Sequence, residues 1–498
     1  MKLKKLAALL AVAGISSPAF ATNGMNMEGY GPVATGMGGA SYAYDNGTAG
    51  LINNPATLAL MASGSSRFDI AIGGLHPDVT TKIAGMPNAD SGGTAYYMPA
   101  VGYVRKDGKL GWGIGMMAQG GMGTEYGTST FLSGFRSMTG KGGLSGQENR
   151  SELGIGRVMV PLTYDVSDNF RIGGTVDFLW GGLDLRMVMD GGTFAKFITP
   201  GATPLGSASG SMVTALPNFM VAGLGGRCGA PAPACITDVN YAQFDFSEGG
   251  NKMKQQATTN GWAGNLGFTW KAAPAVTVGG VYHGKTSLKD MEGDANIKMN
   301  VMMNAPGSAP GTGGPNMVTI AGKIKVVDFQ WPETYGLGIA YQASDKLMLA
   351  ADYKRIGWAG VMKNFRMSFT ANPTQADPMA AQMVGAGAAQ LNATLNQDWD
   401  NQDIVMLGGS YKMSDALTLR AGVSLGNNPI PSGLMHPLFP AIETDHYTLG
   451  LGYAFDKASS VDFAYSRGTE VTVTNNNMGA VSTVHGQNNW QLMYSRKF

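Results

Sequence analysis

Large apolar side chains recur at every second position in several stretches of the chain. The alternation is clearest over residues 335–342, 417–426 and 447–455, where small or polar residues, many of them glycine, stand between the apolar ones. A period of two predicts β-strands, and an apolar face backed by a small or polar face suits a strand with one side toward lipid. A soluble β-sandwich would also alternate, but it would not usually combine so many aromatics with so many glycines opposite them.

Short polar turns follow these stretches, and longer segments rich in Gly and Pro lie between them. Bacterial membrane barrels have short periplasmic turns and long external loops. Six internal turns, with both termini on the periplasmic side, imply seven up-and-down pairs, or about fourteen strands. The turns lie at 106–108, 167–169, 271–274, 344–346, 414–415 and 456–457, and we expect the long loops near 77–94, 120–149, 190–257, 291–325, 372–401, 428–443 and 474–484.

The beginning of the chain carries the three parts of a secretory signal. Lys2 and two further lysines precede a short apolar run at 6–15, and residues 19–21 read Ala-Phe-Ala, a small-x-small cleavage site. The apolar run is too short to span a membrane as a helix. We therefore expect a signal peptide at 1–21 and a mature chain that starts at Thr22.

The final predicted strand ends on Phe498. Trp490, Leu492, Tyr494 and Arg496 share its face, and aromatic side chains there suit the interfacial girdle of a membrane protein. Together with the signal and the alternation, the terminal Phe indicates a client of the outer-membrane barrel assembly machinery. Closure of the barrel requires this strand to pair with the first, near residues 67–75.

Composition narrows the class further. Charged residues make up 14% of the chain and glycines number 74, and the charged share is well below the usual quarter. No run of about 18 apolar residues follows the signal, and in lipid only helices and closed barrels pair every backbone polar group. Without the three signal lysines the chain has 32 basic and 34 acidic residues, so it has no footprint for nucleic acid.

These patterns predict an all-β protein: a fourteen-stranded antiparallel transmembrane β-barrel formed by residues 66–498. We expect it in the outer membrane of a Gram-negative bacterium, as a monomer in contact with outer-membrane lipid.

Residues 22–65 lack the alternation and are rich in glycine. Asn54-Pro55-Ala56 reads as a helix start, with Asn54 as N-cap, Pro55 at the first helical position and a short helix over 57–61. A barrel of this size has a lumen too wide for wall side chains to fill. We interpret 22–65 as a small, partly helical plug inside the lumen. The alternative is a disordered periplasmic tail, against which the apolar content of 51–61 argues.

Motifs for catalysis, metals and cofactors are weak. Residues 279–286 read GGVYHGKT and match the P-loop pattern, but 276–282 reads as a strand and no helical face follows. The five histidines are scattered, and there is no G-x-S-x-G elbow. We expect no cofactor, no metal and no enzymatic activity. Cys228 and Cys235 stand in a Gly/Pro-rich loop of an exported chain, which predicts a disulfide.

Two of the expected external loops are unusually apolar. Exposed apolar surface usually marks the binding of a partner, lipid or ligand. The alternative is that short helices in these loops pack on the barrel rim. The apolar residues recur at roughly helical spacing and are Met212, Val213, Leu216, Phe219, Met220 and Leu224 in one loop and Met379, Met383, Leu391 and Leu395 in the other.

Several short blocks spread over most of the mature chain share the order of a known family. They are Asn54-Pro55-Ala56, Gly111-Trp112-Gly113 with Thr124-Glu125-Tyr126, Trp331-Pro332-Glu333, the segment with Arg420, Gly422, Asn427, Pro429 and Pro431, and Tyr453-Ala454-Phe455-Asp456-Lys457 with Ser460-Val461-Asp462. Together these blocks resemble the FadL/TodX-type outer-membrane transporters, which include long-chain fatty-acid channels and aromatic-hydrocarbon channels.

The resemblance implies a plugged fourteen-stranded barrel and a route for hydrophobic substrates. External loops bearing Met212, Leu216, Phe219 and Met220 would hold the substrate first, followed by a pocket near Thr22, Asn23 and Met25. The substrate would then leave sideways where the third strand kinks inward, at Ala118-Gln119-Gly120-Gly121. Adjacent glycines in a strand independently suggest a bend or bulge. Arg366 resembles a residue that would hold a fatty-acid carboxylate, with Arg186 and His446 as weaker matches.

We therefore expect passive uptake of hydrophobic small molecules, either long-chain fatty acids or hydrocarbons. Sideways exit spares an apolar molecule the aqueous lumen, where wetting costs about 0.8 kcal/mol per CH₂. The alternatives are a general aqueous porin and a structural or adhesive outer-membrane barrel.

Overall fold

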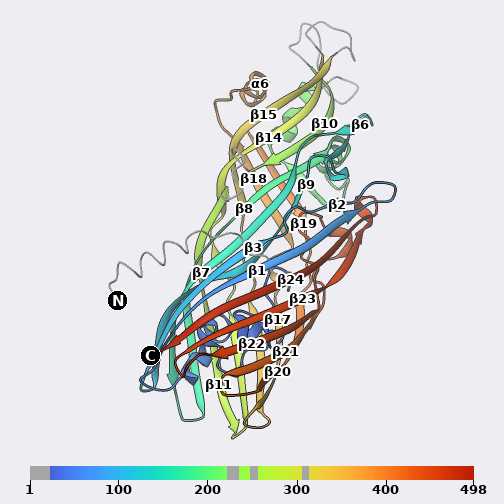
Figure 1. The fold of residues 1–498 in the computed structure, drawn as a ribbon. Helices are drawn as coiled ribbons and strands as arrows, with labels where there is room; N and C mark the ends of the chain where they lie inside the picture. The colour runs from blue at the N-terminus through green and yellow to red at the C-terminus, as the bar shows by residue number, and fades with distance from the viewer. Residues whose placement is uncertain (1–22, 221–234, 247–255, 305–312) are drawn as a thin grey trace.

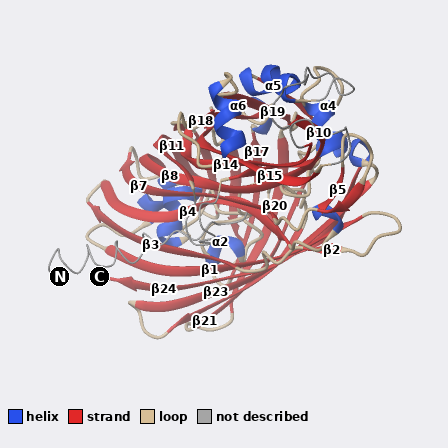
Figure 2. Cartoon of the chain, turned by 90° about the horizontal axis from the view of Figure 1, so that it is seen from above, coloured by secondary structure: helices blue, strands red, loops and turns tan. Residues whose placement is uncertain are grey.

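The computed structural model describes residues 23–220, 235–246, 256–304 and 313–498. The expected signal peptide at 1–21 lies outside these residues. Nearly all strands join one antiparallel sheet that closes on itself into a tall, inclined barrel, with short helices inside it and at its outer end (Figures 1 and 2). Among the described residues, none of the helices has the length and apolar character that crossing a membrane as a helix requires.

The strands vary in length from two residues to more than twenty. The strands of the large sheet are β1 (Ser66–Lys82), β2 (Ala89–Asp90), β3 (Tyr96–Asp107), β4 (Leu110–Tyr126), β7 (Asn149–Asp165), β8 (Phe170–Asp190), β9 (Gly206–Ser209), β10 (Cys235–Asp245), β11 (Ala257–Ala273), β12 (Val276–His283), β13 (Ser287–Leu288), β14 (Met291–Asn304), β15 (Gly314–Val327), β16 (Thr334–Gln342), β17 (Leu347–Ile356), β18 (Asn364–Ala371), β19 (Gln390–Asn396), β20 (Gln402–Lys412), β21 (Leu417–Gly426), β22 (His446–Ala454), β23 (Ser459–Asn475) and β24 (Val481–Lys497). A separate small sheet pairs β5 (Gly134–Arg136) with β6 (Gly142–Leu144).

The helices are short, and most lie in the N-terminal segment or in the outer loops. They are α2 (Pro32–Thr35), η1 (Gly47–Ala49), α3 (Gly50–Asn53), η2 (Pro55–Leu60), η3 (Phe131–Ser133), α4 (Gly191–Phe197), α5 (Ser211–Ala215), η4 (Leu216–Phe219), η6 (Trp358–Gly360), α6 (Pro378–Gly385), η7 (Ser432–Leu434) and η8 (Asn476–Met478), where η marks a 3₁₀ helix.

The sheet closes where the last strand meets the first, as the sequence predicted. β24 pairs with β1 from Arg67 opposite Lys497 to Lys82 opposite Ser482. At the end of this ladder, the backbones of Ser66, the first residue of β1, and Phe498 exchange two hydrogen bonds, at 3.0 and 2.8 Å. Closure leaves no free sheet edge along these strands, as a barrel in lipid requires.

In the half of the barrel near the short turns, which we call the lower half, the alternating apolar residues face outward, as the sequence predicted. Tyr447, Leu449, Leu451 and Tyr453 of β22 are 41–63% exposed on the outside, whereas the residues between them face the interior. All six predicted polar turns lie where one strand ends and the next begins, although two of them, 106–108 and 271–274, overlap the ends of β3 and β11. An apolar outer face with polar residues inside is the arrangement of a strand that contacts lipid.

The prediction of fourteen strands is wrong, because the large sheet contains 22 strands within the described residues. Counting turns assumed one unbroken strand per crossing, but the crossing beside β11 is divided among β12, β13 and β14. β8 likewise pairs with β11 over most of its length and with β10 at its outer end. Segments expected as loops at 190–257, 291–325 and 372–401 contribute β9, β10, β14, β15 and β19.

In these missed strands, the apolar and polar faces are reversed relative to the strands of the lower half. In β14 and β15 the apolar residues, such as Ile297 and Ile320, are buried inside, and charged residues face outward. Lys323 and Lys325 form exposed ion pairs with Asp294 and Glu292 on the neighbouring strand. Charges on the outer face indicate that this part of the wall rises out of the lipid, and the same strands therefore looked like polar loops.

The described N-terminal residues lie inside the barrel (Figure 2), in its lower half (Figure 1). α2 contacts β22, β23 and β24, while η2 contacts β7, β8 and β11. Asn54 caps η2 through its side-chain oxygen, which accepts from the backbone N–H of Ala56 at 3.1 Å, and its amide donates to the carbonyl of Phe268 in the wall at 3.1 Å. The predicted helix start is confirmed, although the helix is 3₁₀ rather than α.

The segment approaches the wall most closely at glycines. A Cβ at Gly408 would lie 2.3 Å from the carbonyl oxygen of Met37, and one at Gly279 would lie even closer to the carbonyl oxygen of Tyr42. Real Cβ atoms do not approach oxygen so closely, so these wall positions accept the segment only because they lack a side chain.

Adjacent glycines on β20 allow a matched test of this contact. A Cβ at Gly409 would meet only Leu349, at 3.5 Å. We expect Gly408→Val to push the segment off the wall at a cost of about 1–3 kcal/mol, and Gly409→Val to leave it in place. Limited proteolysis and ion conductance in planar bilayers measure the displacement. Equal protease sensitivity and conductance of the two variants would contradict the contact.

Candidate functional site

The first described residues form a tight hairpin at the centre of the lumen. Asn23 and Asn26 exchange backbone hydrogen bonds of 2.7 and 3.1 Å. Between them Gly24 has φ +63°, and a Cβ there would lie 2.7 Å from Nε1 of Trp358. Asn23 and Met25 are fully buried. The hairpin therefore packs against an indole face, and a glycine is required at its tip.

Asn26 joins this hairpin to two other parts of the molecule. Its side-chain oxygen accepts from the indole N–H of Trp331 at 2.8 Å and from the amide of Gln119 at 3.0 Å. The hydroxyl of Tyr30 lies 3.4 Å from the same oxygen and donates to the carbonyl of Gln119 at 2.5 Å. One amide thus connects the hairpin, an interior tryptophan and strand β4.

Strand β4 bends inward at the predicted position. Ala118 pairs with Gly156 and Gly120 with Ile155, so Gln119 is an extra residue in the strand and forms a bulge. Gly120 has φ +155°, and a Cβ on it would lie 2.0 Å from the carbonyl oxygen of Met25. The N–H of Gly121 donates to that same carbonyl at 3.1 Å. The bend therefore carries β4 onto the N-terminal hairpin.

The wall is open beside this bend. The ladder between β3 and β4 runs from Asp107–Leu110 to Val101–Met116 and stops there. β3 continues to Tyr96 in partnership with β1. β4 continues to Tyr126 in partnership with β7, with isolated bridges from Gly120 to Asn26 and from Tyr126 to Ser91. A cavity of about 40 Å³ occupies this gap, and its lining includes Met98, Pro99, Ala118 and Ile72. Because Ile72 is 41% exposed to the outside, the gap lies at the lipid-facing surface.

A second cavity of about 40 Å³ lies inside the barrel. Asn26, Gln119 and Trp331 line it together with three basic side chains, Arg157, His283 and Lys354. The basic groups are engaged by the protein itself. Arg157 pairs with Asp177 at 2.7 Å, His283 contacts the side chain of Asn265 at 2.9 Å, and Lys354 lies 3.3–3.4 Å from the carbonyls of Met27 and Glu28.

Aromatic rings extend from this cavity to the outer loops. Each ring contacts the next at 5.3–6.5 Å between centroids, in tilted or edge-to-face geometry, which is the arrangement that aromatic quadrupoles favour. We call this set the aromatic ladder; in order, it comprises His436, Phe439, Phe365, Phe329, Trp331, Trp358 and Trp399. Burial lowers the pKa of His436 to about 4, so its ring is neutral at pH 7.

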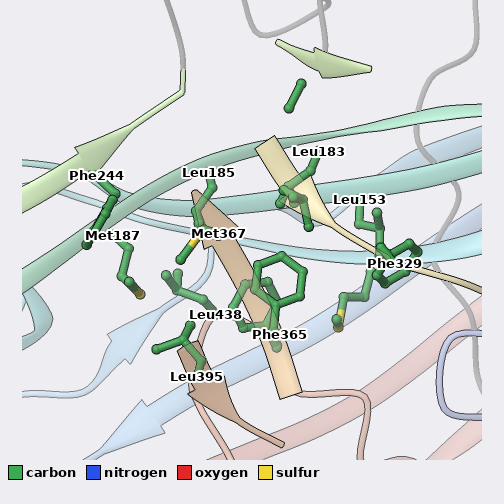
Figure 3. Packing of buried hydrophobic residues seen from close by; sticks show 14 of the residues in the cluster. Leu153, Leu183, Leu185, Met187, Phe244, Phe329, Phe365, Met367, Leu395 and Leu438 are labelled. Atoms are coloured by element: carbon green, nitrogen blue, oxygen red, sulfur yellow. The ribbon is translucent and has the colours of Figure 1, made fainter. Parts of the chain in front are cut away.

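The ladder passes through an apolar core in the outer half of the barrel. Leu153, Leu183, Leu185 and Met187 approach it from β7 and β8, and Phe365 and Met367 from β18 on the opposite side (Figure 3). These side chains point toward one another across the lumen rather than toward lipid. The outer half of the barrel therefore encloses an apolar interior lined by leucine, methionine and phenylalanine.

The apolar residues expected in external loops belong to this same core. Met212, Leu216, Phe219 and Met220 are buried at 2–8% exposure within it. Their segment is held against the other apolar loop, because β9 pairs with β19 and the hydroxyl of Ser211 accepts from the N–H groups of Ala389 and Gln390. In their described residues, the two loops cover the outer end of the core and do not expose an apolar patch.

Other predicted site residues lie apart from this arrangement. Arg366 is about half exposed and pairs with Asp328 at 3.1 Å, so it is not brought to the cavities. Thr22 and Cys228 lie outside the described residues, and Cys235 begins β10, so the disulfide stays a prediction. Within the described residues, no cluster of three or more His, Cys, Asp or Glu side chains has the geometry to hold a metal ion.

Sequence reasoning missed the aromatic ladder and the role of Asn26. Trp331 and Trp358 follow the ends of strands and carry no local motif that assigns them to the lumen. One signal for the gap was present: Pro99 lacks an N–H, and proline in a sheet is confined to edges and bulges. It stands where β3 has lost its partner β4.

Comparison with known proteins assigns the chain to a family. The family described as outer membrane protein transport protein (OMPP1/FadL/TodX) matches residues 8–495. The toluene transporter TodX of P. putida has a similar structure, with a TM-score of 0.77 at 27% identity over 95% of this chain and 99% of that one. The toluene transporter TbuX of Ralstonia pickettii gives 0.69 at 27% identity over 95% and 99%.

Two further comparisons are more limited. A FadL homologue of Pseudomonas aeruginosa has a TM-score of 0.62 at 16% identity over 95% of this chain and 99% of that one, which supports the fold alone. An uncharacterized Chlorobium limicola protein, from the 5' region of the phosphoenolpyruvate carboxykinase gene, is 42% identical over 113 residues. That match covers 23% of this chain and about half of the relative, 54%.

The family match spans nearly the whole chain. The closed barrel agrees with the expectation from the sequence, and the bend at residues 118–121 has the expected position, although it lies on β4 rather than on a third strand. Membership also confirms the predicted outer-membrane location and a role in transport rather than catalysis. The chain belongs to the OMPP1/FadL/TodX family of outer-membrane transport proteins.

Proposed function

We propose that this protein takes up hydrophobic small molecules, and specifically monoaromatic hydrocarbons, and releases them sideways into the outer membrane between β3 and β4. The observation that carries the proposal is the end of the β3–β4 ladder at Val101–Met116, beside a cavity that reaches the lipid-facing surface. Residues 22–65 act in this proposal as a plug that blocks straight passage through the lumen.

The inner surface favours an apolar route. The outer half of the barrel is filled by apolar side chains, and the aromatic ladder leads from the outer loops to the hairpin beside the gap. An apolar molecule that follows it avoids water, and wetting would cost about 0.8 kcal/mol per CH₂. Sideways release through the gap takes the molecule from this apolar interior to the lipid, past the polar side chains that line the interior cavity.

The choice of aromatic hydrocarbons over fatty acids rests on two observations. The structural relatives at 27% identity are toluene transporters. In addition, Arg366, the residue expected to hold a carboxylate, lies on the outside of β18 with its charge paired to Asp328. Edge-to-face contacts along the ladder would favour a flat ring over an aliphatic molecule of the same size.

Filling the gap tests sideways release. Ala118 lines the gap cavity, and we expect Ala118→Trp to reduce uptake of labelled toluene by intact cells to near background, because the indole occupies the exit. Ala421→Trp is the control, since Ala421 is exposed on β21, which is paired on both sides. Heat-modifiable mobility in gels checks that both variants fold. Normal uptake by folded Ala118→Trp would show that release does not use this gap.

Removing one ring from the ladder tests the substrate class. Phe365→Leu keeps an apolar side chain but loses contacts with Phe329 and Phe439. Aromatic contacts contribute about 0.5–1.5 kcal/mol, so we expect binding of toluene to weaken about 2- to 10-fold relative to methylcyclohexane. Phe463→Leu on the lipid-facing side is the control, where Phe463 is 39% exposed. An unchanged toluene-to-methylcyclohexane ratio for Phe365→Leu would argue against aromatic selection by the ladder.

A further inference from the structure

The interior cavity and the gap cavity are separated by very few side chains. Only Met27 and Tyr30 belong to the linings of both cavities. On one side Tyr30 faces the cavity with Trp331 and Lys354, and on the other side it faces the cavity with Met98 and Ala118. These two residues of the N-terminal segment therefore form the partition between the lumen and the opening in the wall.

The backbone and the side-chain hydroxyl of Tyr30 are held by different parts of the protein. Its backbone is fixed within the N-terminal segment, because its carbonyl accepts from the side-chain amide of Asn53 at 2.8 Å and its N–H donates to the side-chain oxygen of Asn53 at 3.4 Å. Its hydroxyl is attached to the wall instead, donating to the carbonyl of Gln119 at 2.5 Å and lying 3.3 Å from the amide of that residue. The ring thus spans from the segment to the bulge of β4.

This attachment is suited to opening and closing. Gln119 is the extra residue of the bulge, so its carbonyl is held by no regular ladder partner in β7. Burial raises the pKa of Tyr30 well above its ordinary value, so the hydroxyl keeps its proton and stays a donor. The groups around the hydroxyl are neutral, and a hydrogen bond between neutral groups contributes about 0.5–1.5 kcal/mol of net stability, while Tyr30 keeps part of its surface exposed. Rotation of the ring therefore has a low barrier compared with displacement of the whole segment.

We propose that Tyr30 is the gate of the lateral route: its ring closes the passage between the interior cavity and the gap in the wall, and its hydroxyl latches that ring to Gln119. The inference rests on the proposed sideways release. The proposed opening is a rotation of one side chain rather than a movement of the entire plug, because Asn53 holds the backbone of Tyr30 in place.

The gate also has a connection to the substrate route. Asn26 contacts the Tyr30 hydroxyl, the Gln119 amide and the Trp331 indole at 2.8–3.4 Å. A hydrocarbon that displaces the Trp331 ring would release the indole hydrogen bond to Asn26. Asn26 could then compete for the Tyr30 hydroxyl, which weakens its bond to Gln119. Arrival of substrate at the inner end of the ladder thus favours opening.

The size of the transported molecule distinguishes a gate from a structural role. We expect Tyr30→Ala to widen the passage, so that uptake of naphthalene relative to toluene rises by about threefold or more. Tyr30→Phe keeps the ring and loses the latch, so uptake of both compounds should rise while their ratio stays unchanged. The measurement is uptake of the two labelled hydrocarbons by cells that carry equal amounts of folded barrel.

Tyr44 supplies the matched control. It is a buried tyrosine of the same segment, its hydroxyl donates to the carbonyl of Ala40, and it lines neither cavity. We expect Tyr44→Ala and Tyr44→Phe to leave the naphthalene-to-toluene ratio at the wild-type value, even if they destabilise the segment. Equal ratios for Tyr30→Ala, Tyr44→Ala and the wild type would overturn the gate.

The double variant Tyr30→Ala/Ala118→Trp separates failure of the gate from failure of lateral release. Loss of uptake in this variant, together with a raised naphthalene ratio in Tyr30→Ala alone, supports both. Loss of uptake with an unchanged ratio in Tyr30→Ala overturns the gate and leaves lateral release standing. Normal uptake by the double variant overturns lateral release, and the gate with it.

Discussion

Backbone atoms of the N-terminal segment touch backbone atoms of the barrel wall, and the rest of the structure depends on this contact. At Gly38, the space that a Cβ would need is occupied within 2.7 Å by backbone atoms of Val423 and Leu407, and at Gly408 the carbonyl of Met37 takes the same role. Side chains at these positions would hold the two backbones apart. Glycines on both surfaces therefore set how deeply the segment sits, and that depth places Asn26 and Tyr30 beside the bulge of β4.

The barrel has two halves with opposite polarity. In the lower half the outer face is apolar and the inner face polar, since the outside meets lipid and the inside meets the polar backbone and side chains of the N-terminal segment. In the upper half β14 and β15 carry ion pairs outside and apolar side chains inside. The change of polarity along one continuous wall creates an apolar interior above the segment, and the interior tryptophans lie at the boundary between the halves.

This inversion explains how much of the fold the sequence could predict. Alternation with an apolar outer face identified the lower strands, the turns between them and the closure of the last strand on the first. In 291–304 and 314–327 the alternation persists, but with Lys323 and Glu292 on the exposed face it resembled a solvent-exposed loop. The strand count failed for that reason, and because a crossing can be divided by a bend, as between β12 and β13. Period two shows that a strand exists, whereas its environment decides which face is apolar.

The candidate site, too, could be predicted from the sequence only in part. The bulge at Gln119–Gly120 could be predicted because adjacent glycines in a strand are a local signal. The aromatic ladder could not, since its rings come from the loops around 329–331, 358 and 436–439 and from β18, and only the closed barrel brings them into contact. Arg366 was assigned by likeness alone, and the exposed position it occupies depends on the orientation of β18, which a resemblance between short motifs does not determine.

The opening in the wall depends on the N-terminal segment inside the barrel. Where β3 and β4 separate, backbone N–H and C=O groups lose their ladder partners at a depth where lipid offers none, which costs several kcal/mol for each unpaired group. On β4 that cost is reduced from within, because the N–H of Gly121 donates to the carbonyl of Met25. On β3, Pro99 has no N–H to satisfy. We therefore expect a barrel without residues 23–65 to close this gap to satisfy its own backbone. Under the proposed sideways release, the segment would both block the lumen and keep the side exit available.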